Sequence, residues 1–434
     1  MADLTHRRVL NIAVPIVISN ASVPILGLVD TGVIGRMGEA APIGAVGVGA
    51  IILGSIYWIF GFLRMGTVGL TSQAVGAEDQ AEVTALFSRV ILIGATAGLA
   101  IILLQVLLFR GAFAVSPASP EVEGLARQYM AIRIWSAPAA IALYGVTGWL
   151  IAQERTRGVM AIQLLMNGTN IVLDIVFVVG FSWGVGGVAF ATFIAEWLAL
   201  GLGIWLCRDA FAHPAWRDRL RLLDPARLKN MALVNFDILI RSVLLQAIFV
   251  SFILFGSDFG DVPLAANQVL LQFLFVTSFA MDGFAFAAES LVGKAMGRKV
   301  SGDVRRASVM TGIWAAVICA FMALAFALGG GWMIDLMTTA PEVRIAARDY
   351  LPYMVAAPLV GCAAWMLDGI FIGATRTVDM RNMMIVSTVI YFASVLPLMA
   401  AFGNHGLWLG LLLSFIVRGI TLGMRYPALE AAAR

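Results

Sequence analysis

The chain has 434 residues, of which 61% are hydrophobic and 13% are charged, and its formal net charge is +3. A soluble domain carries roughly 45–50% apolar and about 25% charged residues, so this chain cannot cover its own surface with polar groups. The composition argues against a soluble globular protein and indicates a membrane protein.

Twelve apolar segments follow one another along the chain. A helix needs roughly 20 residues to cross a bilayer, and these runs are continuous rather than alternating, which favours helices over a barrel. The predicted helices cover residues 9–35, 43–75, 86–109, 124–152, 159–180, 185–207, 231–256, 263–293, 308–330, 345–372, 383–403 and 404–424. We therefore predict an all-α polytopic fold with twelve transmembrane helices.

The two halves of the chain match at an offset of 221 residues. Residues 120–129 align with residues 341–350, and Gly76 aligns with Gly297. An internal repeat of strongly apolar units is typical of a two-lobed transporter. Since each half has six helices, both halves insert in the same orientation. We expect two parallel lobes related by a pseudo-two-fold axis along the membrane normal. The predicted parts are an N-lobe (1–207), a cytoplasmic linker (208–230) and a C-lobe (231–434).

Basic residues concentrate in the connections on one side of the predicted membrane. The inner connections contain Arg7, Arg8, Arg155, Arg157, the basic residues within 208–229 and 294–306, Arg376, Arg381, Arg425 and Arg434. The outer connections contain Arg36, Arg110 and Arg344. By the positive-inside rule, both termini are predicted to be cytoplasmic, in a plasma (inner) membrane.

Polar residues of the first lobe fall at one depth near its outer face. Asp30 lies near the outer end of helix 1, and Asp174 lies at a similar distance from the outer end of helix 5. Asn170 is one turn from Asp174, and Thr192 and Tyr129 reach the same level. Buried acids have raised pKa values, which a reversible proton carrier needs. A polar cluster that only locks the helices together is the structural alternative.

Two prolines interrupt the helix that carries Asp30. Pro15 and Pro24 each remove a backbone hydrogen bond, and a bend beside a titratable group is suited to a gate. We therefore consider both as a helix-1 hinge.

A second set of charges lies deeper, toward the predicted cytoplasmic side. Asp237 and Arg241 are spaced i, i+4 and are expected to pair. The set comprises Arg64, Asp237, Arg241, Asp282, Glu289 and Asp368. It fits either a charge network that closes the inner side or a second ion site.

Cysteines and histidines give no sign of a metal or cofactor site. The three cysteines lie in apolar stretches without paired spacing, and the three histidines are scattered. We expect no metal, no cofactor, no catalytic residue and no nucleic-acid partner, and we expect a monomer in the lipid bilayer.

Several short motifs resemble the multidrug and toxic compound extrusion (MATE) family, specifically its DinF-like branch. They lie at residues 24–31 (PILGLVDT), 63–65 (LRM), 73–77 (QAVGA), 170–174 (NIVLD), 237–242 (DILIRS), 282–285 (DGFA), 368–369 (DG) and 373–376 (GATR). The resemblance covers the whole chain.

The resemblance implies two six-helix lobes that form a V and export cationic or amphipathic compounds by antiport. By similarity, Asp30 is the helix-1 acid that titrates, and Asn170, Asp174 and Thr192 belong to its network. Pro15 matches the helix-1 bend, and Tyr129 matches less closely. At the repeat offset, Asp30 and Asp174 fall on Ser251 and Val395, which favours protons over sodium as the coupling ion.

Other functions remain as alternatives at this stage. They are a sodium-coupled drug antiporter and a flippase or exporter of a lipid-linked or endogenous metabolite. The basic motif between helices 2 and 3 of a major-facilitator transporter is missing from residues 76–82. An intramembrane aspartyl protease could use two buried acids. No Gly-x-Gly-Asp string surrounds Asp30 or Asp174.

Overall fold

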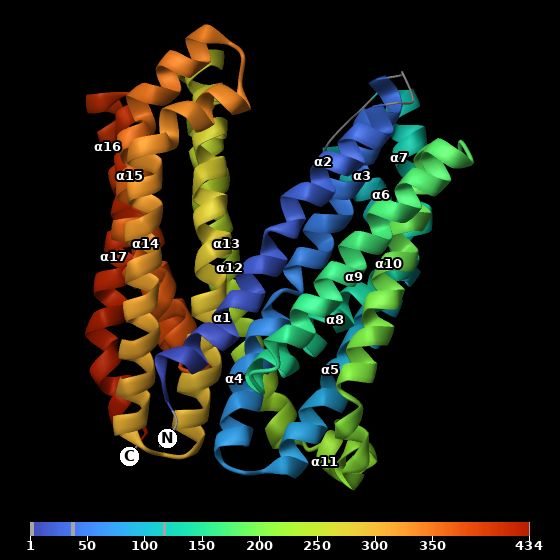
Figure 1. Ribbon diagram of the computed structural model, residues 1–434, viewed down its shortest axis with the longest axis vertical. Helices are drawn as coiled ribbons and strands as arrows, with labels where there is room; N and C mark the ends of the chain where they lie inside the picture. The colour runs from blue at the N-terminus through green and yellow to red at the C-terminus, as the bar shows by residue number, and fades with distance from the viewer. Residues whose placement is uncertain (1–3, 36–39, 116–118, 434) are drawn as a thin grey trace. The chain divides into compact units, whose positions relative to one another are not determined.

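The computed structural model describes residues 4–35, 40–115 and 119–433, and for residues 27, 28, 30, 31, 34, 40 and 115 it describes the backbone alone. Throughout these ranges every regular element is helical (Figure 1). The prediction of an all-α fold is therefore confirmed.

The α-helices follow the order of the predicted apolar segments. They are α1 (His6–Asn20), α2 (Ser22–Gly35), α3 (Ala40–Ile59), α4 (Phe62–Gly76), α5 (Gln80–Leu103), α6 (Gln105–Val115), α7 (Pro120–Arg133), α8 (Ala137–Ala152), α9 (Thr156–Asp174), α10 (Gly184–Leu206), α11 (Arg219–Leu222), α12 (Pro225–Ser257), α13 (Asp261–Gly297), α14 (Ser301–Met337), α15 (Pro341–Gly373), α16 (Thr377–Phe402) and α17 (Asn404–Ala431). Three 3₁₀ segments (Ile134–Ser136, Arg208–Ala212 and Pro214–Arg217) and one π-helix (Ile175–Gly180) complete the set.

Twelve helical spans among the described residues are long and apolar enough to cross a membrane. The predicted number of transmembrane helices is therefore confirmed. Some spans are longer than predicted: the span Asp261–Gly297, predicted to cover residues 263–293, has 37 residues. A bilayer accommodates such lengths by tilt or by extension of the helix beyond the hydrocarbon core.

The described chain divides into two compact units. The N-terminal unit contains Ile18–Thr67 and Asp79–Leu228, and the C-terminal unit contains the chain up to Val17, Val68–Glu78 and the chain from Lys229 onward. These units differ from the predicted lobes in two segments, because the first helix and the end of α4 are divided between them. The lobe boundaries remain a prediction.

Each unit has its own helix packing. In the N-terminal unit, α5 packs on α8, α9 on α10 and α3 on α7. The backbones of α5 and α8 approach closely at two glycines. A Cβ added at Gly94 would overlap Ala142, and a Cβ added at Gly98 would overlap Pro138. In the C-terminal unit, α13 packs on α14 and α15, and α17 packs on α15 and α16 (Figure 1). Aromatic residues fill its core, including Phe252 against Trp408.

The first predicted helix is broken in two at Ala21, between α1 and α2. Pro15 lies inside α1 and Pro24 lies in the first turn of α2. Pro24 has no N–H to donate to the carbonyl of Asn20, four residues earlier, and its ring crowds that carbonyl. The break is therefore explained by Pro24, and the role of either proline as a moving hinge remains a prediction.

Candidate functional site

A buried polar stripe runs along α9. Asn167, Asn170 and Asp174 are spaced i, i+3 and i+7, which places them on one face of the helix. Their exposed fractions are 2%, 4% and 0%. Burying amides and a carboxyl group in a membrane helix is costly unless they have partners or a function. This stripe is the core of the candidate site.

Asn170 and Thr192 are in direct contact, as their predicted depth requires. The Asn170 Nδ2 donates to the Thr192 Oγ1 at 2.9 Å, and the Thr192 hydroxyl donates to the Val188 carbonyl at 3.2 Å. The amide therefore ties α9 to α10 at one turn from Asp174. The side chain of Asp30 lies outside the described residues, so its predicted place beside this contact stays a prediction.

The backbone changes its helical type immediately after Asp174. The chain forms a π-helix over Ile175–Gly180, with Asp174 as the residue before it. A π-helix has a wider and less regular turn than an α-helix, and such segments are frequent at functional sites. Asp174 therefore lies at the junction between an α-helical and a π-helical segment.

The same polar stripe contacts the chain at the break between α1 and α2. The Asn167 Nδ2 donates to the Ser22 Oγ at 2.7 Å, and the Ser22 hydroxyl donates to the Ser19 carbonyl at 2.6 Å. This satisfies a carbonyl that the break at Ala21 would leave without a helical partner. Asn167 and Ser22 were missed in the sequence analysis, although the spacing of Asn167 from Asn170 and Asp174 would have revealed it.

Tyr129, which was predicted to lie at the depth of Asp174, contacts an arginine on its own helix α7. It is 3% exposed, and its hydroxyl accepts a hydrogen bond from Arg133 Nη1 at 3.1 Å. Arg133 in turn forms an ion pair with Glu196 at 3.4 Å. The sequence analysis overlooked Arg133 and Glu196, although each is a charge inside a predicted membrane span.

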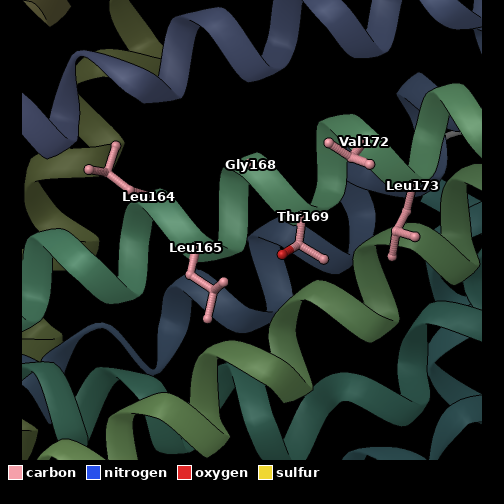
Figure 2. Close-up of a pocket in the computed structure, with 6 residues that line it drawn as sticks. All are labelled: Leu164, Leu165, Gly168, Thr169, Val172 and Leu173. Carbon is pink, nitrogen blue, oxygen red and sulfur yellow. The ribbon is translucent and has the colours of Figure 1, made fainter.

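α9 has an apolar face opposite the polar stripe. Figure 2 shows a hollow of about 430 Å³ along that face. Its lining residues are Leu164, Leu165, Gly168, Thr169, Val172 and Leu173. The hollow is thus on the side of α9 that faces away from Asn170 and Asp174. It belongs to a different surface from the candidate ion site.

Two of the predicted inner acids, Asp368 and Asp237, are paired with arginines. Asp368 forms ion pairs with Arg241 and, at 3.4 Å, with Arg418. Asp237 pairs with Arg381 at 2.6 Å and accepts the Thr377 hydroxyl at 2.9 Å. The predicted pair of Asp237 with Arg241 is therefore wrong. Residues one turn apart on a helix can each find a better-placed partner on a neighbouring helix, here α15 and α16.

The remaining members of the predicted inner set are divided between the units. Asp282 and Glu289 lie on α13 in the C-terminal unit, where Glu289 is buried. Arg64 lies in the first turn of α4, in the N-terminal unit, within electrostatic range of Tyr144. The structure thus pairs Asp237, Arg241 and Asp368 with partners inside one unit.

Comparison with known proteins identifies the family. The MatE family model matches residues 15–176 and 238–396. The chain belongs to the MatE family. It is 35% identical to DNA damage-inducible protein F of Escherichia coli (strain K12), over 97% of this chain and 92% of that protein. It is 27% identical to a probable multidrug resistance protein NorM of Xanthomonas axonopodis pv. citri, over 96% of this chain and 92% of that protein.

Solved MATE structures share the fold. The bent form of the Vibrio cholerae MATE transporter VcmN has a TM-score of 0.88 at 20% identity, covering 99% of this chain and 97% of that chain. The predicted resemblance to MATE transporters is therefore confirmed. The match is to a family of transport proteins and not to a family of enzymes, and the twelve spans make the chain an integral membrane protein.

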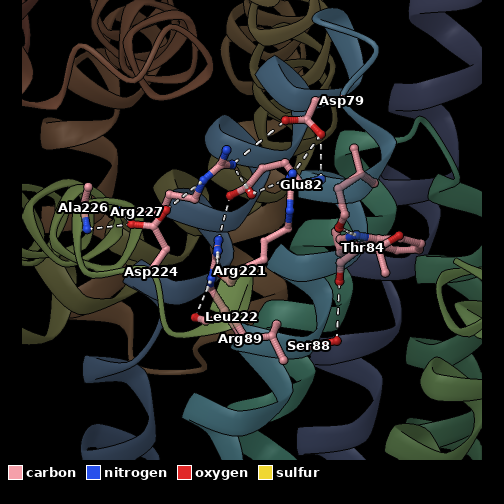
Figure 3. Close-up of polar contacts among 12 residues, drawn as sticks. Asp79, Glu82, Thr84, Ser88, Arg89, Arg221, Leu222, Asp224, Ala226 and Arg227 are labelled. Carbon is pink, nitrogen blue, oxygen red and sulfur yellow. Dashed lines mark hydrogen bonds and ion pairs between the residues drawn. The ribbon is translucent and has the colours of Figure 1, made fainter. Parts of the chain in front are cut away.

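In this MATE protein the segment predicted as a polar linker is folded onto α5. Figure 3 shows Arg89, which is 2% exposed, donating to the carbonyls of Arg221 and Leu222 at 2.6 and 3.1 Å. Arg89 also pairs with Glu82 at 2.6 Å, and Glu82 pairs with Arg227. The segment contains short helices and is anchored by ion pairs along much of its length. A charged residue inside the predicted span 86–109, Arg89, could have indicated this contact from the sequence.

Proposed function

We propose that this MATE transporter exports cationic or amphipathic toxic compounds in exchange for protons, by alternating access. The support is its membership of the MatE family together with the multidrug-resistance names of several relatives. In this proposal, the two predicted lobes alternate between outward and inward states, and both termini are cytoplasmic.

The observation that carries the choice of proton is the burial of Asp174. This carboxyl group is fully buried in a membrane span, adjoins a π-helix and lies one turn from the Asn170–Thr192 contact. Removing a carboxylate from water favours its neutral, protonated form. The side chain therefore has the properties of a group whose charge can be switched by proton uptake.

The same geometry suggests how a proton and a substrate exclude one another. A charged carboxylate in this layer attracts a cationic substrate, whereas a protonated carboxyl group does not. Asp30, at the predicted depth of Asp174, is the acid that carries the proton, and Asp174 supports it. Proton uptake from outside releases the substrate, and proton loss inside restores the site. Each ligand then stabilises a different conformational state through differential binding.

The alternative of sodium coupling at the deeper acids is less well supported. Asp368 is held between Arg241 and Arg418, and Asp237 is paired with Arg381. Arginines stay protonated and oppose the entry of another cation beside these acids. These ion pairs favour a structural role for the inner set over a sodium site.

The test is drug transport into reconstituted or everted vesicles under separately imposed proton and sodium gradients. A proton gradient alone is expected to drive accumulation of a fluorescent lipophilic cation, and a sodium gradient alone is expected to have no effect. Transport driven by sodium at constant pH would contradict the proposal. The Arg241→Lys variant, which keeps the charge beside Asp368, is the control for the inner set.

A further inference from the structure

Glu196 lies one helical turn from the candidate ion site and has no part in the function proposed above. Thr192 and Glu196 are spaced i, i+4 on α10, so their side chains project from the same face. Glu196 is 8% exposed and lies inside the candidate span Gly184–Leu206. Because Thr192 is bonded to Asn170, polar groups extend from Asp174 along α9 and α10 to Glu196.

The ion pair of Glu196 is incomplete at both ends. The Arg133 Nη2 contacts the Glu196 Oε1 at 3.4 Å, which is a long contact for a charged pair. The Glu196 Oε2 and the Arg133 Nε are enclosed and have no hydrogen-bond partner among the described residues. A buried carboxylate oxygen without a donor carries a desolvation cost that a bound proton would remove.

The groups around Glu196 come from five other helices. Arg133 and Tyr129 project from α7, and Arg133 lies 5.9 and 6.0 Å from the ring centroids of Tyr129 and Tyr57. Tyr57 of α3 and Tyr144 of α8 are within electrostatic range of Glu196. Arg64 of α4 is within electrostatic range of Tyr144. On α9, Asn170 is hydrogen-bonded to Thr192, and Asp174 lies one turn farther along that helix. Arg133 is the charged group in direct contact with Glu196.

We propose that Glu196 is a second proton-binding site of this transporter, adjacent to the Asp174 layer and switched against Arg133. The ligand is a proton because the unbonded Oε2 is enclosed and because Arg133 repels metal cations. Proton uptake forms one O–H bond on the carboxylate and breaks no other bond. The ion pair with Arg133 is then lost, while Arg133 keeps its hydrogen bond to Tyr129.

This proposal rests on the proposed proton coupling, and it gives Tyr129 a role. Arg133 must keep a partner when Glu196 becomes neutral, and the Tyr129 hydroxyl and ring provide one. A proton bound at Glu196 would lie one turn along α10 from Thr192, or roughly 6 Å along the helix axis. Thr192 in turn accepts the hydrogen bond from Asn170, which lies one turn from Asp174.

The test is an infrared difference spectrum of the purified full-length protein in lipid, between acidic and alkaline buffers. It is recorded in an Asp30→Asn/Asp174→Asn background, so that neither predicted coupling acid titrates. We expect a carbonyl-stretch band of a protonated carboxyl group to appear on acidification. The band should shift in Glu196→Asp and disappear in Glu196→Gln. The matched control is Glu123→Gln, which removes an acid from a half-exposed i, i+4 ion pair on α7 and should leave the band unchanged.

An identical band in Glu196→Gln, or no band in the background, would overturn the proposal and leave Glu196 as part of a structural ion pair. If Glu196→Gln does not fold, the shift in Glu196→Asp decides the question. The spectrum needs neither substrate nor an ion gradient. Its failure is therefore distinct from a failure of proton-driven export, which the vesicle assay measures with the unmodified chain.

Discussion

Gly76 and Gly297 occupy equivalent positions of the internal repeat, and each packs against the helix that the other ends. Gly76 is the last residue of α4, and a Cβ placed there would overlap the carbonyl of Lys294 on α13. Gly297 is the last residue of α13, and a Cβ there would overlap the carbonyl of Gln73 on α4. Gln73 and Lys294 are themselves repeat equivalents. This reciprocal contact lies within the C-terminal unit.

We expect Gly76→Ala and Gly297→Ala each to lower the thermal stability of the detergent-solubilised protein. A methyl group must push a backbone carbonyl aside, and overpacking of this kind costs about 1–3 kcal/mol or more. Gly312→Ala on α14 is the control, because an added Cβ there meets no atom nearby. It should leave stability unchanged or raise it slightly, since alanine favours a helix. Equal melting temperatures for all three variants would contradict the close contact.

Arg241→Ala is expected to impair folding more than transport. It removes the closer of two arginines from Asp368 and leaves a buried carboxylate with Arg418 at 3.4 Å. Removing one partner of a buried ion pair lowers the free energy of unfolding by roughly 3–5 kcal/mol. Because Arg418 still neutralises Asp368, we expect a loss toward the lower end of this range. Expression level and thermal stability are the measurements.

The control for Arg241 is Arg376→Ala, which removes a half-exposed i, i+3 pair with Asp379 and should have little effect. If Arg241→Ala is produced at normal levels and stability but loses coupled transport, the inner network is functional rather than structural.

Helix number and the shared helix face of Asn170 and Asp174 were predictable from the sequence because they depend on local pattern. Apolar runs of sufficient length predict spans, and the spacing of Asn170 from Asp174 predicts a shared helix face. The depth argument also placed Thr192 level with Asn170, and the two are hydrogen-bonded.

Partners on distant helices were not predictable in the same way. Local spacing suggested a pair between Asp237 and Arg241, yet their ion pairs are formed with Arg381 and Asp368, more than a hundred residues later. The predicted depth of Tyr129 did not reveal its hydrogen bond with Arg133, because depth does not specify which way a side chain points. The break at Ala21, between the two prolines, depends on the backbone N–H that Pro24 lacks.

A single cysteine at Leu220 tests the predicted topology. Leu220 is 88% exposed in the segment that joins the two halves, so Leu220→Cys is expected to react with a membrane-impermeant maleimide from the cytoplasmic side only. The native Cys207 nearby is buried, and burial raises the pKa of its thiol to about 12. Since the thiolate is the reactive form, Cys207 should remain unlabelled near neutral pH and serve as an internal control. Labelling of Leu220→Cys in intact cells, from outside, would overturn the orientation.

Proton coupling predicts different effects for the two acids of the first repeat. Asp30→Asn mimics a permanently protonated side chain, so the protein should fold, reach the membrane and fail to couple export to a proton gradient. Asp174→Asn should be impaired, with less loss, because Asp174 influences Asp30 through the polar layer that contains Asn170 and Thr192. The measurement is the initial rate of cation efflux at several pH values, normalised to protein in the membrane.

The matched control for these acids is Asp335→Asn, which removes a carboxylate from half-exposed ion pairs at the end of α14 and should transport at the wild-type rate. Asp174→Asn should also flatten the dependence of efflux on pH, since one of two interacting acids no longer titrates. Thr192→Val, which removes the hydroxyl that receives the Asn170 amide, should shift that dependence without abolishing transport. If Asp30→Asn exports at the wild-type rate under a proton gradient alone, the polar layer is not the coupling site. Coupling would then have to be sought at the inner acids, which are Asp237, Asp282, Glu289 and Asp368.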